Sequence, residues 1–185
     1  MTDNALLRSV WCRENIERAA VGMYHRGPSL YARVIYEMKY ARRPRLAKDT
    51  VRYLLQQPFL HEFCARHDVI VPVPTTWWRR WMRGYNPAEV IAGAIADGCG
   101  VRMMSDALYR RAGRRQSRTH GEERISMDGL RFRMEHTSGI APDSRILLVD
   151  DVSTTGTTLS ACAMAMRKAL PEAVIDVFTL AWAGE

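Results

Sequence analysis

Two adjacent carboxylates, Asp150 and Asp151, end an apolar run and precede several small hydroxyl residues in the segment RILLVDDVSTTGTTL (145–159). The apolar run predicts a strand at residues 145–150, and residues 157–169 predict a helix. The carboxylates therefore come at the carboxyl end of a strand, which is the edge at which open α/β sheets bind ligands. Two such hydrogen-bond acceptors are suitable partners for the vicinal hydroxyls of a sugar.

The turn between this strand and this helix has the composition of a phosphate-binding site. A helix N-terminus presents unpaired N–H groups and a partial positive charge, which favour anions. Glycine lets the backbone turn tightly against a phosphate, and short hydroxyl side chains add donors without bulk. The residues predicted to bind are Ser153, Thr154, Thr155, Gly156, Thr157 and Thr158. Together with the two carboxylates they predict a receptor for a sugar phosphate.

Three other interpretations of this motif explain less of it. An ordinary helix N-cap accounts for one or two hydroxyls but not for the adjacent carboxylates. A P-loop requires a terminal Gly-Lys-Ser/Thr sequence, which does not follow here. The acidic pocket of a response regulator follows an early strand, whereas too few residues remain after Asp151 for the further strands and helices of such a domain.

The hydrophobic pattern elsewhere predicts an α/β domain around the motif. Strand, turn, helix and strand follow one another between residues 145 and 182, which is typical of a βαβ unit with a parallel sheet. The other expected elements are two helices within 29–57 broken near Pro44, a buried strand at 69–74, a helix at 87–97, a strand at 131–136 and a last strand at 174–182.

The composition is that of a globular protein with an excess of basic residues. A chain of 185 residues fits one domain, and a net charge of +7 favours polyanionic partners, either nucleic acid or small phosphorylated molecules. No apolar window approaches the roughly 18 residues of a membrane span, and the N-terminal sequence lacks the pattern of a secretory signal. We therefore expect no membrane span and a cytoplasmic location. The four cysteines are scattered without a C-x-x-C pair, so we expect no zinc site.

A basic flexible loop is predicted at residues 109–126. Its sequence YRRAGRRQSRTHGEER (109–124) is densely charged and has no apolar periodicity. Loops of this length within a domain are usually functional or mobile. Two interpretations stay open: the loop closes over the site as a lid that excludes water, or it is a solvated basic surface.

The stretch TTWWRRWMRGY (75–85) interleaves three tryptophans with three arginines. Aromatic stacking combined with cationic side chains binds single-stranded nucleic acid without sequence preference. Alternatively, the tryptophans cover the edge of the sheet while the arginines face solvent, and we favour this packing because tryptophans are more often buried than not. The candidate contacts to nucleic acid or pyrophosphate are Trp77, Trp78, Arg79, Arg80 and Arg83.

The segment VDDVSTTGTT resembles the 5-phosphoribosyl-1-pyrophosphate (PRPP) motif of type I phosphoribosyltransferases. Residues 71–92 (VPVPTTWWRRWMRGYNPAEVIA) and the segment EMKYARRPRLAKDTVRYL resemble parts of the ComF competence-protein family. The resemblance implies the type I phosphoribosyltransferase fold, a twisted, mostly parallel sheet flanked by helices with a small irregular hood. The implied domain spans residues 29–185, and residues 1–28 would form an N-terminal extension without the zinc ribbon that many family members carry.

The same resemblance implies roles for the site residues. Asp150 and Asp151 would contact the ribose hydroxyls, the turn at 154–158 would hold the 5-phosphate, and the turn at Pro74, Thr75 and Thr76 would meet the pyrophosphate with its backbone. Mg²⁺ would accompany PRPP, with oxygen ligands mainly from pyrophosphate and water and with the two aspartates as candidate protein ligands. The catalytic candidates are Asp150, Asp151, Arg111, Gln116 and Arg124, of which the last three match the family's basic loop.

Two departures from the family pattern bear on function. Met127 stands where the family usually has Asn after the loop arginine. Thr154 stands where purine-salvage relatives have an Asp that acts on the base, and a threonine cannot accept a proton in that way. Purine salvage is therefore disfavoured.

Three functions are consistent with these patterns. The first is an enzyme that transfers a phosphoribosyl group from PRPP to a nitrogen nucleophile, or the reverse. The second, which follows from the resemblance, is a non-catalytic competence protein that handles single-stranded DNA. The third is a regulator that senses PRPP without turnover.

Overall fold

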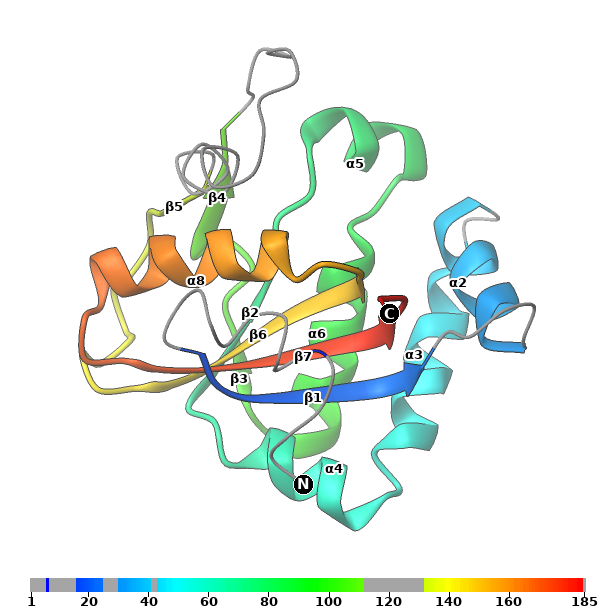
Figure 1. Cartoon of the computed structure of the whole chain (residues 1–185), viewed down its shortest axis with the longest axis horizontal. Coiled ribbons are helices and arrows are strands. Elements are labelled where there is room, and N and C mark those ends of the chain that lie inside the picture. The colour runs from blue at the N-terminus through cyan, green and yellow to red at the C-terminus, as the bar shows by residue number, and fades with distance from the viewer. Residues whose placement is uncertain (1–5, 7–15, 25–29, 41–42, 112–131, 185) are drawn as a thin grey trace.

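The computed structural model of the chain describes residues 6, 16–24, 30–40, 43–111 and 132–184 (Figure 1). At the centre of this described part is a five-stranded sheet in the order β1-β7-β6-β2-β3, in which all neighbouring strands are parallel. The strands are β1 (Ile16–Tyr24), β2 (Val69–Pro72), β3 (Arg102–Met103), β6 (Arg145–Ser153) and β7 (Val174–Trp182). The predicted α/β class with a mostly parallel sheet is confirmed.

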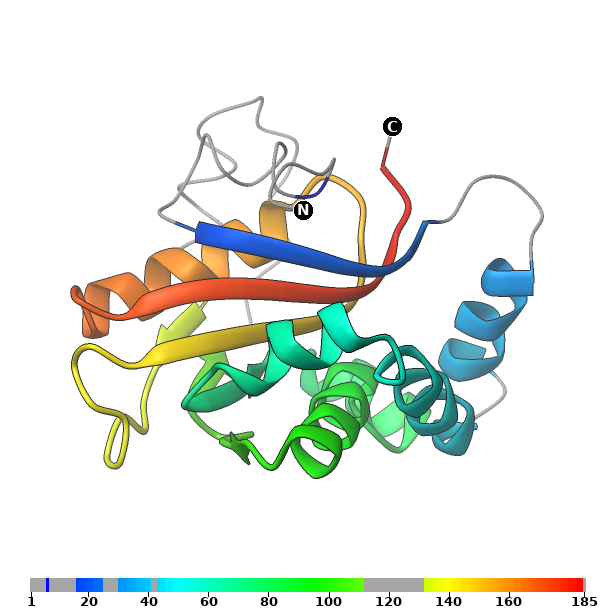
Figure 2. The ribbon, with the colours of Figure 1, turned by 90° about the horizontal axis from the view of Figure 1, so that it is seen from below.

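Helices cover both faces of the sheet (Figure 2). One face is covered by α8 (Thr157–Ala169). The helices on the other face are α3 (Pro44–Leu54), α4 (Pro58–Ala65) and α6 (Pro87–Cys99). The predicted helices and strands are found close to their expected bounds, including the break at Pro44.

Strand β6 shows why both faces need cover. Its residues Ile146 and Leu148 pack in the same cluster as Leu159 of α8, whereas Leu147 and Val149 belong to the cluster on the opposite side. Successive side chains of a strand point to opposite faces, so a continuous apolar run is stable only between two layers.

Four of the described elements stand outside these layers. Strand β4 (Leu108–Arg110) pairs antiparallel with β5 (Phe132–Met134). Helix α5 (Trp77–Arg83) has no buried residue and lies apart from the sheet, as does α2 (Leu30–Tyr40) (Figure 1). The described part of the chain contains no helix long and apolar enough to cross a membrane.

The predicted N-terminal extension contributes a strand to the sheet. Strand β1, within residues 1–28, pairs in parallel with β7 from Ile16 to Tyr24, and it forms one edge of the sheet. The sequence IERAAVGMY lacks clean apolar alternation, so the sequence did not predict this strand.

The motif strand is longer than predicted. We expected it to end at Asp150, but β6 continues to Ser153, and Asp150 still pairs with Thr179 of β7. Both carboxylates therefore belong to the last residues of a strand rather than to the turn that follows it.

Candidate functional site

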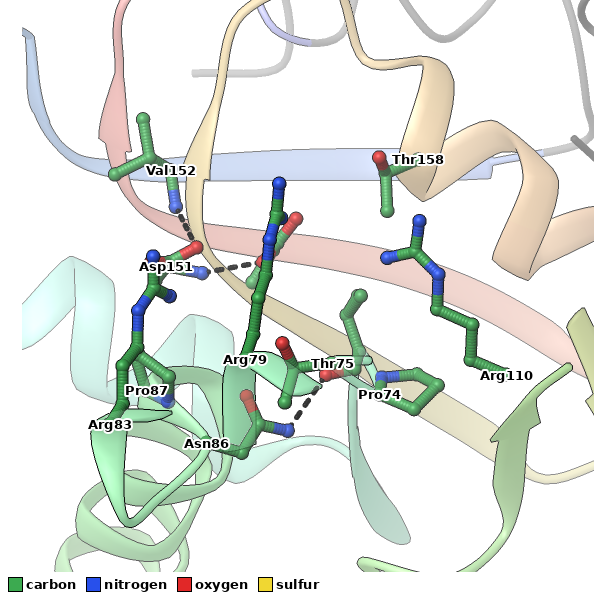
Figure 3. A pocket seen from close by; sticks show the side chains of 12 residues that line it. Pro74, Thr75, Arg79, Arg83, Asn86, Pro87, Arg110, Asp151, Val152 and Thr158 are labelled. Carbon is green, nitrogen blue, oxygen red and sulfur yellow. Dashed lines mark hydrogen bonds between the residues drawn. The ribbon is translucent and has the colours of Figure 1, made fainter. Parts of the chain in front are cut away.

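A cavity of about 150 Å³ opens where β2 and β6 end (Figure 3). Four segments far apart in the sequence surround it: the turn after β2 with α5, the start of α6, strand β4, and the end of β6 with the start of α8. The lining residues are Val73, Pro74, Thr75, Arg79, Arg83, Asn86, Pro87, Arg110, Asp150, Asp151, Val152 and Thr158. The structure thus brings both predicted carboxylates, two residues of the proline turn (Pro74 and Thr75) and one of the predicted hydroxyl residues (Thr158) to a single cavity.

The two carboxylates are oriented by their own strand. Asp150, which is 9 % exposed, accepts a hydrogen bond at Oδ1 from the Asp151 amide, 2.8 Å away. The half-buried Asp151 likewise accepts from the Val152 amide at 2.8 Å. Each side chain is therefore fixed by the backbone of the next residue, which limits the conformational entropy lost when a ligand binds.

The hydroxyl turn has the backbone geometry expected of a phosphate cradle. Gly156 adopts a left-handed conformation (φ 69°) and no side chain caps the first turn of α8. Thr158 lines the cavity, while the Thr155 and Thr157 hydroxyls lie 2.8 Å apart and share a hydrogen bond. Ser153 is instead buried in β6, where it pairs with Trp182.

The turn after β2 is tied to both neighbouring elements. The Val73 amide donates to the Val149 carbonyl at 2.8 Å, which joins the turn to β6. The buried Asn86 donates from Nδ2 to the Val73 carbonyl at 3.0 Å and accepts at Oδ1 from the Ala88 amide at 3.2 Å. One side chain thus caps α6 and holds the turn whose residues Pro74 and Thr75 line the cavity.

Arginines approach the cavity from two sides. Arg79 and Arg83 reach it from α5, and Arg110 reaches it from β4 (Figure 3). Arg80 of the same helix lies outside the cavity and pairs with Glu89 at 2.6 Å. Three guanidinium groups beside two carboxylates suit a ligand with both anionic and hydroxyl groups.

The remaining predicted site residues lie elsewhere. Thr76 is the N-cap of α5 and accepts from the Arg79 amide at 3.3 Å. Arg111 is exposed just after β4. Gln116 and Arg124 lie outside the described residues, as does nearly all of the predicted basic loop.

Our favoured packing of the tryptophans is wrong. Trp77, Trp78 and Trp81 are 74 %, 56 % and 64 % exposed, and they contact one another on α5 instead of covering the sheet edge. The physical reason is that α5 stands apart from the core, so none of its side chains finds a layer to pack against.

Sequence patterns alone did not single out Asn86 as a site residue, and they placed Arg110 only in the basic loop. The Asn-Pro pair at the start of a predicted helix is a capping signal, and it was available in the sequence. The cavity position of Arg110 depends on the pairing of β4 with β5, which no local pattern indicates.

Two protonatable groups near the cavity are held neutral. Burial raises the pKa of the Cys162 thiol well above its ordinary value, the Asp150 charge acts in the same direction, and Arg110 opposes them. Burial also raises the pKa of Tyr85, whose hydroxyl donates to the Met38 carbonyl. Neither group is therefore an ionised nucleophile at neutral pH.

The described residues contain no cluster of three or more His, Cys, Asp or Glu side chains that could hold a metal ion. A Mg²⁺ ion needs fewer, because it is commonly bound by one or two carboxylates together with the phosphates of a substrate and water. Asp150 and Asp151 fit that second kind of site, since both line the cavity and offer oxygen donors.

Comparisons with known proteins agree with this geometry. Residues 47–183 match a family model described as phosphoribosyl transferase domain. Competence protein F of Haemophilus influenzae is 30 % identical over 107 residues, which is 55 % of this chain and 44 % of that protein. DNA utilization protein YhgH of Salmonella typhimurium is 30 % identical over 146 residues, 73 % of this chain and 60 % of that protein.

Two further proteins complete the comparison. Competence protein ComFC of Bacillus subtilis is 31 % identical over 115 residues, covering 62 % of this chain and 45 % of that protein. The chain thus spans about half the length of the curated relatives that it matches. Adenine phosphoribosyltransferase of Leishmania tarentolae superposes with a TM-score of 0.43 at 13 % identity, over 73 % of this chain and 70 % of that one.

Proposed function

Since this chain belongs to the phosphoribosyl transferase domain family, we propose that its cavity binds PRPP with Mg²⁺ and that it transfers the phosphoribosyl group to or from a nitrogen nucleophile. One observation carries this proposal: the carboxylates at the end of β6, Thr158 at the start of α8 and two arginines of α5 line one cavity. The competence and DNA utilization relatives support the ComF-type membership expected from the motifs.

The cavity offers a separate partner for each part of such a ligand. Asp150 and Asp151 accept hydrogen bonds from the ribose 2- and 3-hydroxyls, which are vicinal. The turn around Gly156 receives the 5-phosphate at the N-terminus of α8. The turn at Pro74 and Thr75 receives the pyrophosphate with its backbone.

The arginines act on the charge that develops during transfer. Positive charge builds on the ribose while negative charge builds on the departing pyrophosphate, so fixed cationic groups beside the leaving group stabilise the transition state. Arg79, Arg83 and Arg110 line the cavity and are suited to this role. Holding sugar and nucleophile in one orientation contributes the rest.

Mg²⁺ would be held by Asp150 or Asp151 together with oxygens of the ligand, and it would supply neutralising charge to the pyrophosphate. The protein's own contribution is to present these carboxylates in a fixed orientation, since each accepts a hydrogen bond from the next amide.

Binding is tested by titrating PRPP into the protein with Mg²⁺ in a calorimeter and by thermal shift. We expect the Asp150→Asn, Asp151→Asn double variant to bind at least about 100-fold more weakly, because each hydrogen bond to a charged group contributes roughly 1.5–3 kcal/mol. The matched control is Asp97→Asn, Asp143→Asn, which removes the same charge from two exposed positions. Equal PRPP affinity in all three proteins would contradict the proposal.

Measuring pyrophosphate release distinguishes phosphoribosyl transfer from PRPP sensing. Pyrophosphate release that depends on Mg²⁺ and on an added nitrogen acceptor supports the enzyme. Stabilisation by PRPP without any release supports the regulator, because a ligand that binds only the folded state raises its stability.

A second candidate function is the handling of single-stranded DNA. The relatives are named for competence and DNA utilization, and this chain has a net charge of +7 and an exposed group of tryptophans among arginines. We expect binding of micromolar affinity or tighter, which weakens steeply with salt because counterions are released. No binding at low salt, or unchanged binding after removal of Arg79, Arg80 and Arg83, contradicts this candidate.

A further inference from the structure

The outer side of α5 is an exposed aromatic surface, formed by Trp77, Trp78 and Trp81 and here called the aromatic face. The three side chains are 74 %, 56 % and 64 % exposed, and the neighbouring Met82 is 53 % exposed. Large apolar side chains scattered singly over a surface are ordinary, but a contiguous group marks an interaction site. The proposed sugar-phosphate function does not use this group.

The rings of the aromatic face form one surface. The ring centroids of Trp78 and Trp81 are 5.2 Å apart with planes 28° from parallel, and those of Trp77 and Trp81 are 6.4 Å apart with planes 16° from parallel. Trp81 therefore stacks on both of its partners and connects them. Pre-stacked rings lose little conformational freedom when a further flat ring is added.

The basic residues of α5 favour a nucleic acid over a protein as the partner of this surface. Its sequence WWRRWMR contains three arginines and no acidic residue. Residues 77, 78 and 81 fall on one side of a helix with 3.6 residues per turn, whereas 79 and 83, whose side chains line the cavity, fall on the other. Arg80, three residues after Trp77, lies next to the rings on the helix surface, and a cation beside stacked rings suits bases joined by phosphates.

We infer that the aromatic face binds unpaired bases of single-stranded DNA, with Arg80 beside the phosphate chain. This inference rests on the DNA-handling candidate above and adds the residues that contact the strand. Paired bases hide their flat faces within the duplex, so the face discriminates between single and double strands.

The inference is tested by fluorescence anisotropy with a labelled oligo-dT of about 15 nucleotides, which is near the upper site size of a single-strand binding domain. We expect Trp81→Ala to weaken binding by about 5- to 100-fold, since it removes the ring that is stacked on both of the others. Trp81→Phe keeps a ring and loses less. The matched control is Phe59→Ala on α4, which removes an aromatic ring that is 61 % exposed.

Two checks belong to the same experiment. Because the substituted side chains are exposed, each variant is expected to keep the melting temperature of the wild type. A duplex of the same length is expected to bind more weakly than the single strand, and an RNA strand no more tightly than the DNA. Tighter binding of duplex or of RNA overturns the assignment.

The outcomes separate this inference from the functions on which it rests. If the wild type binds oligo-dT and Trp81→Ala binds equally well, the aromatic face is not the site although DNA handling stands. If the wild type does not bind at low salt, DNA handling and the inference fail together. A loss in Phe59→Ala equal to that in Trp81→Ala also overturns it. The Asp150→Asn, Asp151→Asn variant is expected to bind DNA normally, whatever its affinity for PRPP.

Discussion

Asn86 joins the turn that lines the cavity to the helix that follows it, so its replacement tests how the site is held. Its side chain is 3 % exposed and makes two hydrogen bonds, to the Val73 carbonyl at 3.0 Å and from the Ala88 amide at 3.2 Å. Asn86→Ala removes both. Asn86→Ser keeps an oxygen that can cap α6 but cannot reach the Val73 carbonyl.

The two bonds have different expected magnitudes. Loss of an N-cap costs about 1 kcal/mol. Loss of the donor to a buried carbonyl costs about 1–3 kcal/mol, because the carbonyl oxygen is then desolvated without that partner. We therefore expect Asn86→Ala to lower the free energy of unfolding by about 2–4 kcal/mol and Asn86→Ser to lower it by about 1–3 kcal/mol.

Urea unfolding measures both values. With a slope of about 2 kcal/mol per molar urea, Asn86→Ala is expected to lower the midpoint by about 1–2 M. Weaker PRPP binding by Asn86→Ser is expected as well, since Pro74 and Thr75 lose their tie to α6. A midpoint that moves by less than about 0.3 M in Asn86→Ala refutes the reasoning, because a buried double contact cannot be that weak.

Three further predictions concern other parts of the molecule. His67→Ala is expected to lower the free energy of unfolding by about 3–5 kcal/mol, because Asp176 is fully buried and loses its 3.1 Å partner; a loss below about 1 kcal/mol in urea unfolding contradicts this. Cys99 is expected to react with iodoacetamide at a rate that rises through about pH 7, because the hydrogen bond from the Cys64 thiol lowers its pKa to about 7. Cys64→Ala is expected to move the midpoint of this pH dependence upward. A reaction midpoint near 9 in the wild type, the ordinary pKa of a thiol, contradicts this expectation. Gly156→Ala is expected to lower the free energy of unfolding, measured with urea, by about 1–2 kcal/mol, because φ is 69° at this residue. It is also expected to weaken PRPP binding in the calorimeter. If neither quantity changes, the turn at Gly156 is not the phosphate site.

The sequence motif predicted the centre of the site because its parts are local. An apolar run, two carboxylates and a glycine-containing turn before a helix are contiguous, and their relative positions follow from strand and helix geometry alone. The structure adds that β6 continues through Asp151 to Ser153, which a pattern of apolar residues cannot indicate once polar residues begin.

The rest of the site depends on contacts between distant segments. Arg110 reaches the cavity through the pairing of β4 with β5, and β1 joins the sheet through β7 although its own sequence has no clear alternation. The exposure of the tryptophans contradicts a general tendency to burial, because that tendency applies only where a neighbouring layer exists. The catalytic roles of Gln116 and Arg124 stay predictions.

Helix α5 is held by its ends and by an ion pair, with Thr76 capping its start, Gly84 (φ 81°) ending it, and Arg80 bonded to Glu89. None of its side chains anchors it in the core. Its position therefore depends on the contacts at its two ends and on Arg80, so we expect a ligand bound on either side to restrict the whole helix. If a strand binds outside and a sugar phosphate binds inside, thermodynamic reciprocity requires that any change one ligand makes in the affinity of the other is matched by the same factor in return. An affinity measured for either ligand alone then describes only one of the four binding steps that connect the free, singly bound and doubly bound states.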